Sequence, residues 1–211
     1  PRTGGIKEAN AGGQAGQALA RLGYAAIVLE GVPAGDTLYK VLINADGVQI
    51  SEAGAYKGLR TYELAEKIKA EHGDKVAMIA IGTAGEMRMA AASVAVTDRE
   101  FRPTRHAGRG GVGAVMGSKG IKVIVVDDAG AKMRQPKDPD RFKAANKRFA
   151  EGLRRHAVTG EGLPAYGTNV LTNVVNEAGA YPTYNFKQGQ YDDASQISGE
   201  TFADLETRRG G

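Results

Sequence analysis

"HAGRGGVGAVMGSKGIKVIVV" (residues 106–126) joins a glycine-rich loop to a continuous β-branched apolar run. Six of the thirteen residues from Gly108 to Gly120 are glycine. Glycine at that density costs backbone entropy, so something is expected to approach this loop closely enough to exclude side chains. The apolar run that follows, residues 121–128, is predicted to be a buried strand.

Further strands are predicted on both sides of this stretch. Buried strands are expected at residues 23–31, 75–82 and 90–98, each an apolar run bounded by turn-forming or polar residues. Residues 37–51 are read as two strands, with Asp46-Gly47 supplying the hairpin turn between them.

Helices are predicted where the apolar residues recur with helical spacing. Residues 61–73 form the clearest case, with Thr61 as the expected cap and Gly73 as the stop. Other helices are expected over 14–22, from Asp138-Pro139 onward, at 168–180 and in the tail from residue 198. The fold class is therefore α+β, with a β-sheet-rich domain at 1–132. Residues 133–211 are expected to be the start of an incomplete helical domain.

Composition excludes several classes of protein. The 211 residues are 42% hydrophobic and 25% charged, as in ordinary globular domains. The chain has no cysteine, so it cannot by itself hold a disulfide, an iron–sulfur cluster or thiolate-bound zinc. Its three histidines lack zinc-motif spacing, and no apolar run approaches the ~18 residues of a membrane span. With no signal peptide recognisable, a cytoplasmic protein is expected.

Positive charge is concentrated around the glycine loop. The net charge of the chain is +4. Between Arg99 and Lys122, six basic residues face a single acidic one (Arg99, Arg102, Arg105, Arg109, Lys119 and Lys122 against Glu100). Cations beside a glycine-rich loop favour an anionic ligand, most simply a phosphate, over a merely solvated basic surface.

Three phosphate-binding arrangements compete for the glycine loop. The P-loop pattern fails, because the residue five positions before Gly117 is Val112. Residues 108–113 match the dinucleotide pattern G-x-G-x-x-G, and Asp127 follows a strand. That reading is disfavoured because polar residues precede the loop and only residues 114–116 are expected to be helical after it.

In the third arrangement, backbone N–H groups of the loop approach an anion that Arg105 and Arg109 neutralise. A second glycine-rich segment, residues 8–19, is placed to serve the same ligand. Two such elements in one domain favour a large ligand with more than one anionic group.

Four stretches resemble the aldehyde ferredoxin oxidoreductase family, in the family's order. They are "EANAGGQAGQALARLGYAAIVLEG" (8–31), "IGTAGEMRMAAASV" (81–94), "RHAGRGGVGAVMGSKGIKVIVV" (105–126) and "GLPAYGTNVLTNVVNEAGAYPTYNF" (162–186). The second stretch departs from the family's usual Gly-Pro-Ala-Gly-Glu at Thr83. The resemblance runs over essentially the whole chain.

The resemblance implies a particular cofactor. Tungsten, or molybdenum, would be held by the dithiolenes of two pyranopterins, with Mg²⁺ bridging their phosphates and a [4Fe–4S] cluster whose ligands lie outside this chain. The cofactor contacts would be Asn10, Gly12, Gly13, Arg105, His106, Ala107, Gly108, Arg109 and Gly110. Main-chain carbonyls of Asn10 and His106 would bind the magnesium, a cation that prefers oxygen ligands.

The implied function is oxidation of small aldehydes to carboxylic acids, with ferredoxin or another electron-transfer protein as the acceptor. The chain is expected to be an internal fragment, without catalytic residues of its own and inactive alone. The resemblance leaves open reduction of aromatic thioesters or acids, and assembly into a homo-oligomer. Two other classes stay open as well: a nucleic-acid-binding module that uses Arg99–Lys122, and a purely structural fragment.

Overall fold

The computed structural model describes residues 6–133 and 135–209. The chain divides into two compact units, Pro1–Arg134 and Gln135–Gly211. The first holds the sheet and the second is helical.

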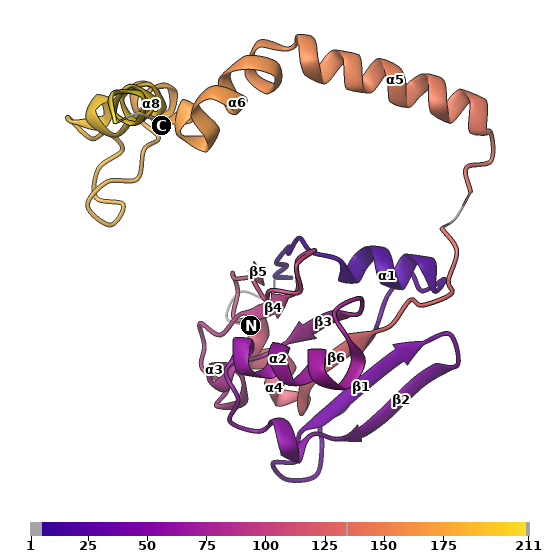
Figure 1. Ribbon diagram of the computed structural model, residues 1–211. Helices are drawn as coiled ribbons and strands as arrows, with labels where there is room; N and C mark the ends of the chain where they lie inside the picture. Colours follow the sequence, from indigo (N-terminus) through magenta and orange to yellow (C-terminus); the bar gives the residue numbers. More distant parts are fainter. Residues whose placement is uncertain (1–5, 134, 210–211) are drawn as a thin grey trace. The chain divides into compact units, whose positions relative to one another are not determined.

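The first unit is built on one six-stranded mixed sheet (Figure 1). Its strands are β1 (Tyr39–Asn44), β2 (Gly47–Glu52), β3 (Ala77–Ala80), β4 (Val94–Val96), β5 (Arg105–Ala107) and β6 (Ile121–Val126). Their order is β2-β1-β6-β3-β4-β5. Only β1 and β6 run parallel; the other neighbours are antiparallel. All six residues of β6 are buried, which explains why its sequence is uninterrupted by polar alternation apart from Lys122.

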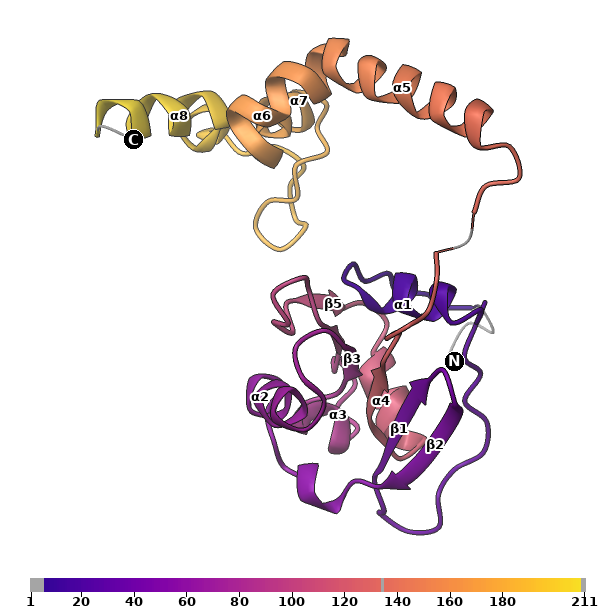
Figure 2. The same cartoon turned by 45° about the vertical axis from the view of Figure 1, so that its right-hand side comes forward.

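Helices cover both faces of this sheet (Figure 2). On one face, α2 (Thr61–His72) packs Leu64 and Ile68 against β3 and β6, beside the short helix η1 (Gly54–Tyr56). On the other face, α1 (Ala15–Arg21) and α4 (Val112–Ser118) contribute Ala18 and Met116 to a second core. The one-turn helix α3 (Thr83–Glu86) packs against α4.

The predicted α+β class is confirmed, and so are most of the strands. The hairpin lies where Asp46-Gly47 was expected to turn, with Asn44 opposite Gly47. The apolar runs at 75–82, 90–98 and 121–128 contain β3, β4 and β6. Apolar runs and turn chemistry therefore carry enough local information to define these elements.

The strand predicted at 23–31 is wrong. In the described chain this segment joins no ladder, although Ile27 and Leu29 pack on the second core. The reason is non-local: apolar side chains of this segment are partly buried on the face of the sheet, in the same core as Val41 and Ile43 of β1, without pairing to a strand.

Two helix starts also differ from prediction. Arg60, not Thr61, is the N-cap of α2, because the Glu63 carboxylate accepts a 2.9 Å hydrogen bond from the Arg60 backbone N–H. The glycine loop is followed by a full α4 over Val112–Ser118, longer than the expected 114–116, and the short strand β5 precedes it. The dinucleotide fold still does not arise, since β5 is at the sheet edge and antiparallel to β4.

The second unit contains four α-helices within its described residues. They are α5 (Pro139–Arg155), α6 (Leu163–Tyr166), α7 (Leu171–Glu177) and α8 (Gly199–Arg208). Asp138 caps α5 as expected, its carboxylate accepting a 2.9 Å hydrogen bond from the Arg141 N–H. The helix predicted at 168–180 is shorter, because a 3₁₀ turn (Gly167–Val170) precedes α7. None of the helices in the described chain is long and apolar enough to cross a bilayer.

A cluster of ionisable side chains ties η1 and α2 to β1. Tyr56, 5% exposed, donates a hydrogen bond to Glu71, and Lys40 lies 3.1 Å from the Tyr56 hydroxyl. Burial and the bond to Glu71 raise the pKa of Tyr56. Burial acts to raise the pKa of Glu71, but the hydrogen bond from Tyr56 and the charge of Lys40 together have the larger effect and lower the pKa of that carboxyl.

Replacing Tyr56 with phenylalanine is therefore expected to cost about 1 kcal/mol of unfolding free energy at neutral pH. Because the folded-state pKa of Tyr56 is raised above its usual 10.0, its contribution is complete below pH 10 and disappears as the pH rises through the folded value. Urea titrations of both proteins from pH 7 to 11 measure this. A wild-type advantage that stays constant over that range would contradict it.

Candidate functional site

Much of the glycine loop serves packing within the first unit. A Cβ on Gly111, whose φ is +67°, would overlap the carbonyl oxygen of Ala90. A Cβ on Gly113 would lie 2.7 Å from the carbonyl carbon of Ala92, and one on Gly117 would overlap the carbonyl oxygen of Gly85. Part of the glycine density is therefore explained by packing, because α4 lies directly on the backbone of residues 85–92.

The first residues of the loop remain accessible. A Cβ on Gly108 would meet nothing within 4 Å. The Arg109 guanidinium pairs with the Glu8 carboxylate and donates a 3.3 Å hydrogen bond to the Glu8 carbonyl. The side chain of Lys7 lies against Gly110, where a Cβ would overlap it. The loop is therefore bound to the segment that leads into Asn10.

The predicted first contact segment lies exposed just before α1. Asn10, Gly12 and Gly13 are all exposed. Gly13 has a φ of +101°, and a Cβ there would be 2.5 Å from the carbonyl oxygen of Thr97. Gln14 fixes this approach, because its N–H donates to the Thr97 carbonyl at 3.1 Å and its side-chain amide to the Asp98 carbonyl at 3.3 Å.

The predicted second contact segment begins on β5, at the edge of the described sheet. Arg105 and His106 are exposed, and Ala107 is 9% exposed. The His106 ring places Nδ1 2.9 Å from the Ser93 hydroxyl. The aliphatic part of Arg105 lies 3.6 Å from where a Gly12 Cβ would be. The structure thus brings the two predicted segments, far apart in sequence, side by side.

Asp98 organises the loop between β4 and β5. Its carboxylate accepts hydrogen bonds from the backbone N–H groups of Arg102 (3.0 Å) and Glu100 (2.9 Å), and from the Thr104 hydroxyl (2.9 Å). These bonds, that of Arg102 first, lower the pKa of Asp98 to about 2. Sequence reasoning missed Asp98 and Gln14; the polar cluster before Pro103 was the available signal for a side-chain-stabilised turn.

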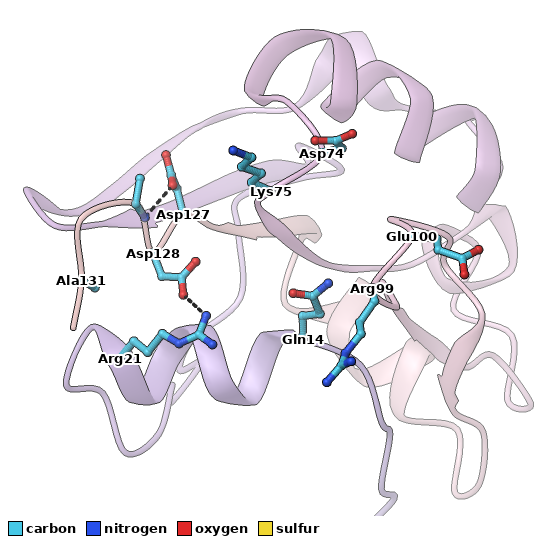
Figure 3. A pocket seen from close by; sticks show the side chains of 10 residues that line it. Gln14, Arg21, Asp74, Lys75, Arg99, Glu100, Asp127, Asp128 and Ala131 are labelled. Carbon is cyan, nitrogen blue, oxygen red and sulfur yellow. Dashed lines mark hydrogen bonds and ion pairs between the residues drawn. The ribbon is translucent and has the colours of Figure 1, made fainter. Parts of the chain in front are cut away.

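Two adjoining cavities lie between α1 and this loop. One has a volume of about 800 Å³ and is lined by residues of both predicted segments, including Gly12, Gly13 and Arg105. The other, about 560 Å³, extends toward Asp127 and Asp128 at the end of β6 (Figure 3). Gln14, Arg21, Arg99 and Glu100 line both.

The basic window does not form one continuous cationic surface. The Lys122 side chain is fully buried against Glu86. Arg102 pairs with Asp98 and Glu100, and Arg109 pairs with Glu8. Three of the six basic side chains at residues 99–122 are thus paired within the unit, which weakens the nucleic-acid alternative.

Comparison with known proteins follows the same division as the structure. The family profile described as "Aldehyde ferredoxin oxidoreductase, N-terminal domain" matches residues 1–128, and that of "domains 2 & 3" matches residues 144–211. These matches define the class: an α+β unit followed by helices of an oxidoreductase family. The chain belongs to the aldehyde ferredoxin oxidoreductase family.

Curated relatives include the tungsten-containing aldehyde ferredoxin oxidoreductases of Pyrococcus horikoshii and Thermococcus kodakarensis. They are 43% and 40% identical to the chain over 96% and 95% of its length. The chain spans 32% of the length of each, about a third.

A solved structure shares the fold. The active-site complex BamBC of benzoyl-coenzyme A reductase, in complex with 1,5-dienoyl-CoA, has a TM-score of 0.66 and 25% identity. The similarity covers 93% of this chain and 30% of that one.

Proposed function

We propose that the chain is the cofactor-binding portion of a tungsten pterin oxidoreductase that oxidises aldehydes to carboxylic acids and passes the electrons to ferredoxin. The observation that carries this proposal is the approach of two exposed segments, around Gly12 and around Arg105, on a family member whose relatives are named tungsten-containing enzymes. Molybdenum in place of tungsten, and reduction of aromatic thioesters or acids, are the alternatives within the same family.

The residues present suit a flat, doubly phosphorylated cofactor. Asn10 and Gly12 are exposed, and a Cβ on Gly108 would meet nothing within 4 Å, so a ring system can approach the backbone of both segments. Arg105 offers a donor fork suited to phosphate. We assign the contacts to Asn10, Gly12, Gly13 and to residues 105–110. Main-chain carbonyls of Asn10 and His106 would hold Mg²⁺, a cation that prefers oxygen ligands.

The chain's own part in the chemistry is orientation and charge compensation. A tungsten bis-pyranopterin supplies two-electron oxidation of an aldehyde when it is bound, and a [4Fe–4S] cluster with ligands outside this chain would carry the electrons onward. The first unit would hold the pterins by backbone contacts and neutralise their phosphates with arginine. Substrate-contacting groups are assigned to other parts of the full enzyme.

The decisive experiment grafts the chain into a complete enzyme. A chimera replaces the matching third of the Pyrococcus horikoshii relative with these 211 residues. Elemental mass spectrometry after gel filtration is expected to find tungsten or molybdenum with about two phosphorus atoms per metal. A folded chimera with neither metal, prepared beside a loaded parent, would overturn the proposal.

In this chimera, Arg109→Ala is expected to weaken cofactor retention about tenfold, the cost of losing a charge-assisted hydrogen bond to phosphate. Because Arg109 also pairs with Glu8, the matched control is Glu8→Gln, which breaks that pair but keeps the guanidinium. Retention is measured as tungsten remaining after graded urea treatment. Equal losses in the two variants would mean that Arg109 acts only by anchoring the preceding segment.

A further inference from the structure

The two adjoining cavities together form a groove, and Arg99 is a residue of this groove that belongs to neither of the two predicted contact segments. It lies in the loop between β4 and β5 and lines both adjoining cavities. Within the described residues, its guanidinium makes no ion pair or side-chain hydrogen bond, and the same is true of Arg105. Figure 3 shows Arg99 beside Gln14 in the smaller cavity.

The other two arginines of the larger cavity are already neutralised. Arg21 pairs with Asp128 at 2.6 Å, and this pair is drawn in Figure 3. Arg102 pairs with Glu100 at 2.5 Å and with Asp98 at 3.4 Å. The acidic residues that line the larger cavity, Asp98 and Glu100, both contact Arg102. Counting Asp128 as the partner of Arg21, the larger cavity carries four arginines against three carboxylates, a net charge of +1, and Arg99 and Arg105 are the two that make no ion pair within the described residues.

The walls that carry these two free arginines are held rigidly together. Gln14 bridges from the start of α1 to the carbonyls of Thr97 and Asp98, the residues directly before Arg99. The Asp98 carboxylate then fixes the turn through residues 100–104, which ends at Arg105. Both arginines therefore extend from one hydrogen-bonded loop, so an anion that binds them has to order the two side chains but not the backbone that carries them.

We propose that Arg99 and Arg105 form a two-arginine site for a phosphate or diphosphate group in this groove, with Arg99 as a new binding residue. Two planar donor forks on one groove match the several acceptor oxygens of such a group. The Gln17 side chain, also on the groove wall, offers an uncharged amide donor. That the occupant is a pterin phosphate rests on the proposed function. The ability of the two arginines to bind a phosphate group does not depend on that function.

The test uses inorganic pyrophosphate as the probe and the 211-residue chain as the protein. Isothermal titration calorimetry compares wild type with Arg99→Gln, Arg99→Lys and Arg154→Gln. Arg154 is the matched control, because it lies exposed on α5 in the other unit and its loss changes net charge equally. Pyrophosphate affinity is expected to fall about tenfold in Arg99→Gln and less in Arg99→Lys, and by less than about twofold in Arg154→Gln.

Absence of pyrophosphate binding to wild type would overturn the proposal, and so would equal losses in Arg99→Gln and Arg154→Gln. The chimera separates this result from the proposed function. If pyrophosphate binding depends on Arg99 but the chimera holds no metal, the two-arginine site is supported and the pterin function is rejected. Loss of tungsten and phosphorus in the Arg99→Gln chimera would identify the occupant as the cofactor. Full retention there, with weakened pyrophosphate binding, would identify it as free phosphate.

Discussion

Lys122→Met is expected to lower the unfolding free energy of the first unit by about 3–5 kcal/mol, the cost of breaking a buried ion pair from one side. The Lys122 side chain is fully buried near the start of β6, where it pairs with Glu86 and donates a 2.8 Å hydrogen bond to the Leu59 carbonyl. Glu86 is 12% exposed. Methionine leaves that carboxylate with only the Gly58 N–H as a described partner.

Urea denaturation followed by far-ultraviolet circular dichroism measures this loss. The matched variant combines Lys122→Met with Glu86→Gln, which removes the orphaned charge and keeps the hydrogen bond from Gly58. It is expected to recover at least half of the lost stability. If the unfolding free energy of Lys122→Met alone lay within about 1 kcal/mol of wild type, this would show that water reaches the ion pair and solvates it.

Gly117→Ala should have the second-largest effect, about 3 kcal/mol of destabilisation, at the upper end of the range for overpacking. An alanine Cβ would overlap the Gly85 carbonyl oxygen and lie 2.8 Å from its carbon. Both clashing atoms belong to backbone, so relief requires α3 and α4 to move apart. Thermal unfolding of the variant gives the magnitude.

Gly16→Ala is the control, since it makes the same change in α1, where a Cβ would meet nothing within 4 Å. Its stability should be unchanged or slightly higher, because alanine favours helix over glycine. Similar losses at both positions would contradict the assignment of the Gly117→Ala effect to close contact between α3 and α4.

The strands that could be predicted are those whose signal is local. The Asp46-Gly47 hairpin and the apolar run of β6 need only neighbouring residues to be recognised. The segment 23–31 carries the same kind of signal, yet it forms no strand, because its apolar side chains pack on the face of the sheet instead. That packing depends on β1 and on β6, which is distant in sequence, so no window of neighbouring residues indicates it.

The residue types of the candidate site could be predicted from the sequence, but most contacts of those residues could not. Glycines and arginines at residues 99–122 indicated an anionic ligand, but the partners of the cations lie far away in sequence. Arg109 pairs with Glu8, which is 101 residues away, and Lys122 with Glu86. Likewise, Gly113 and Gly117 meet backbone from residues 85–92 instead of open space. Long-range packing therefore accounts for some of these glycines, and the others remain for the proposed binding of a ligand.

The position of β6 has a consequence for synthesis. This strand comes last in the first unit, yet it lies between β1 and β3 in the middle of the sheet. Until Ile121–Val126 has been synthesised, the β1–β2 hairpin and the β3–β4 pair lack the strand that lies between them. The unit is therefore expected to form on the ribosome in one late event, with exposed edges that need protection from aggregation until then.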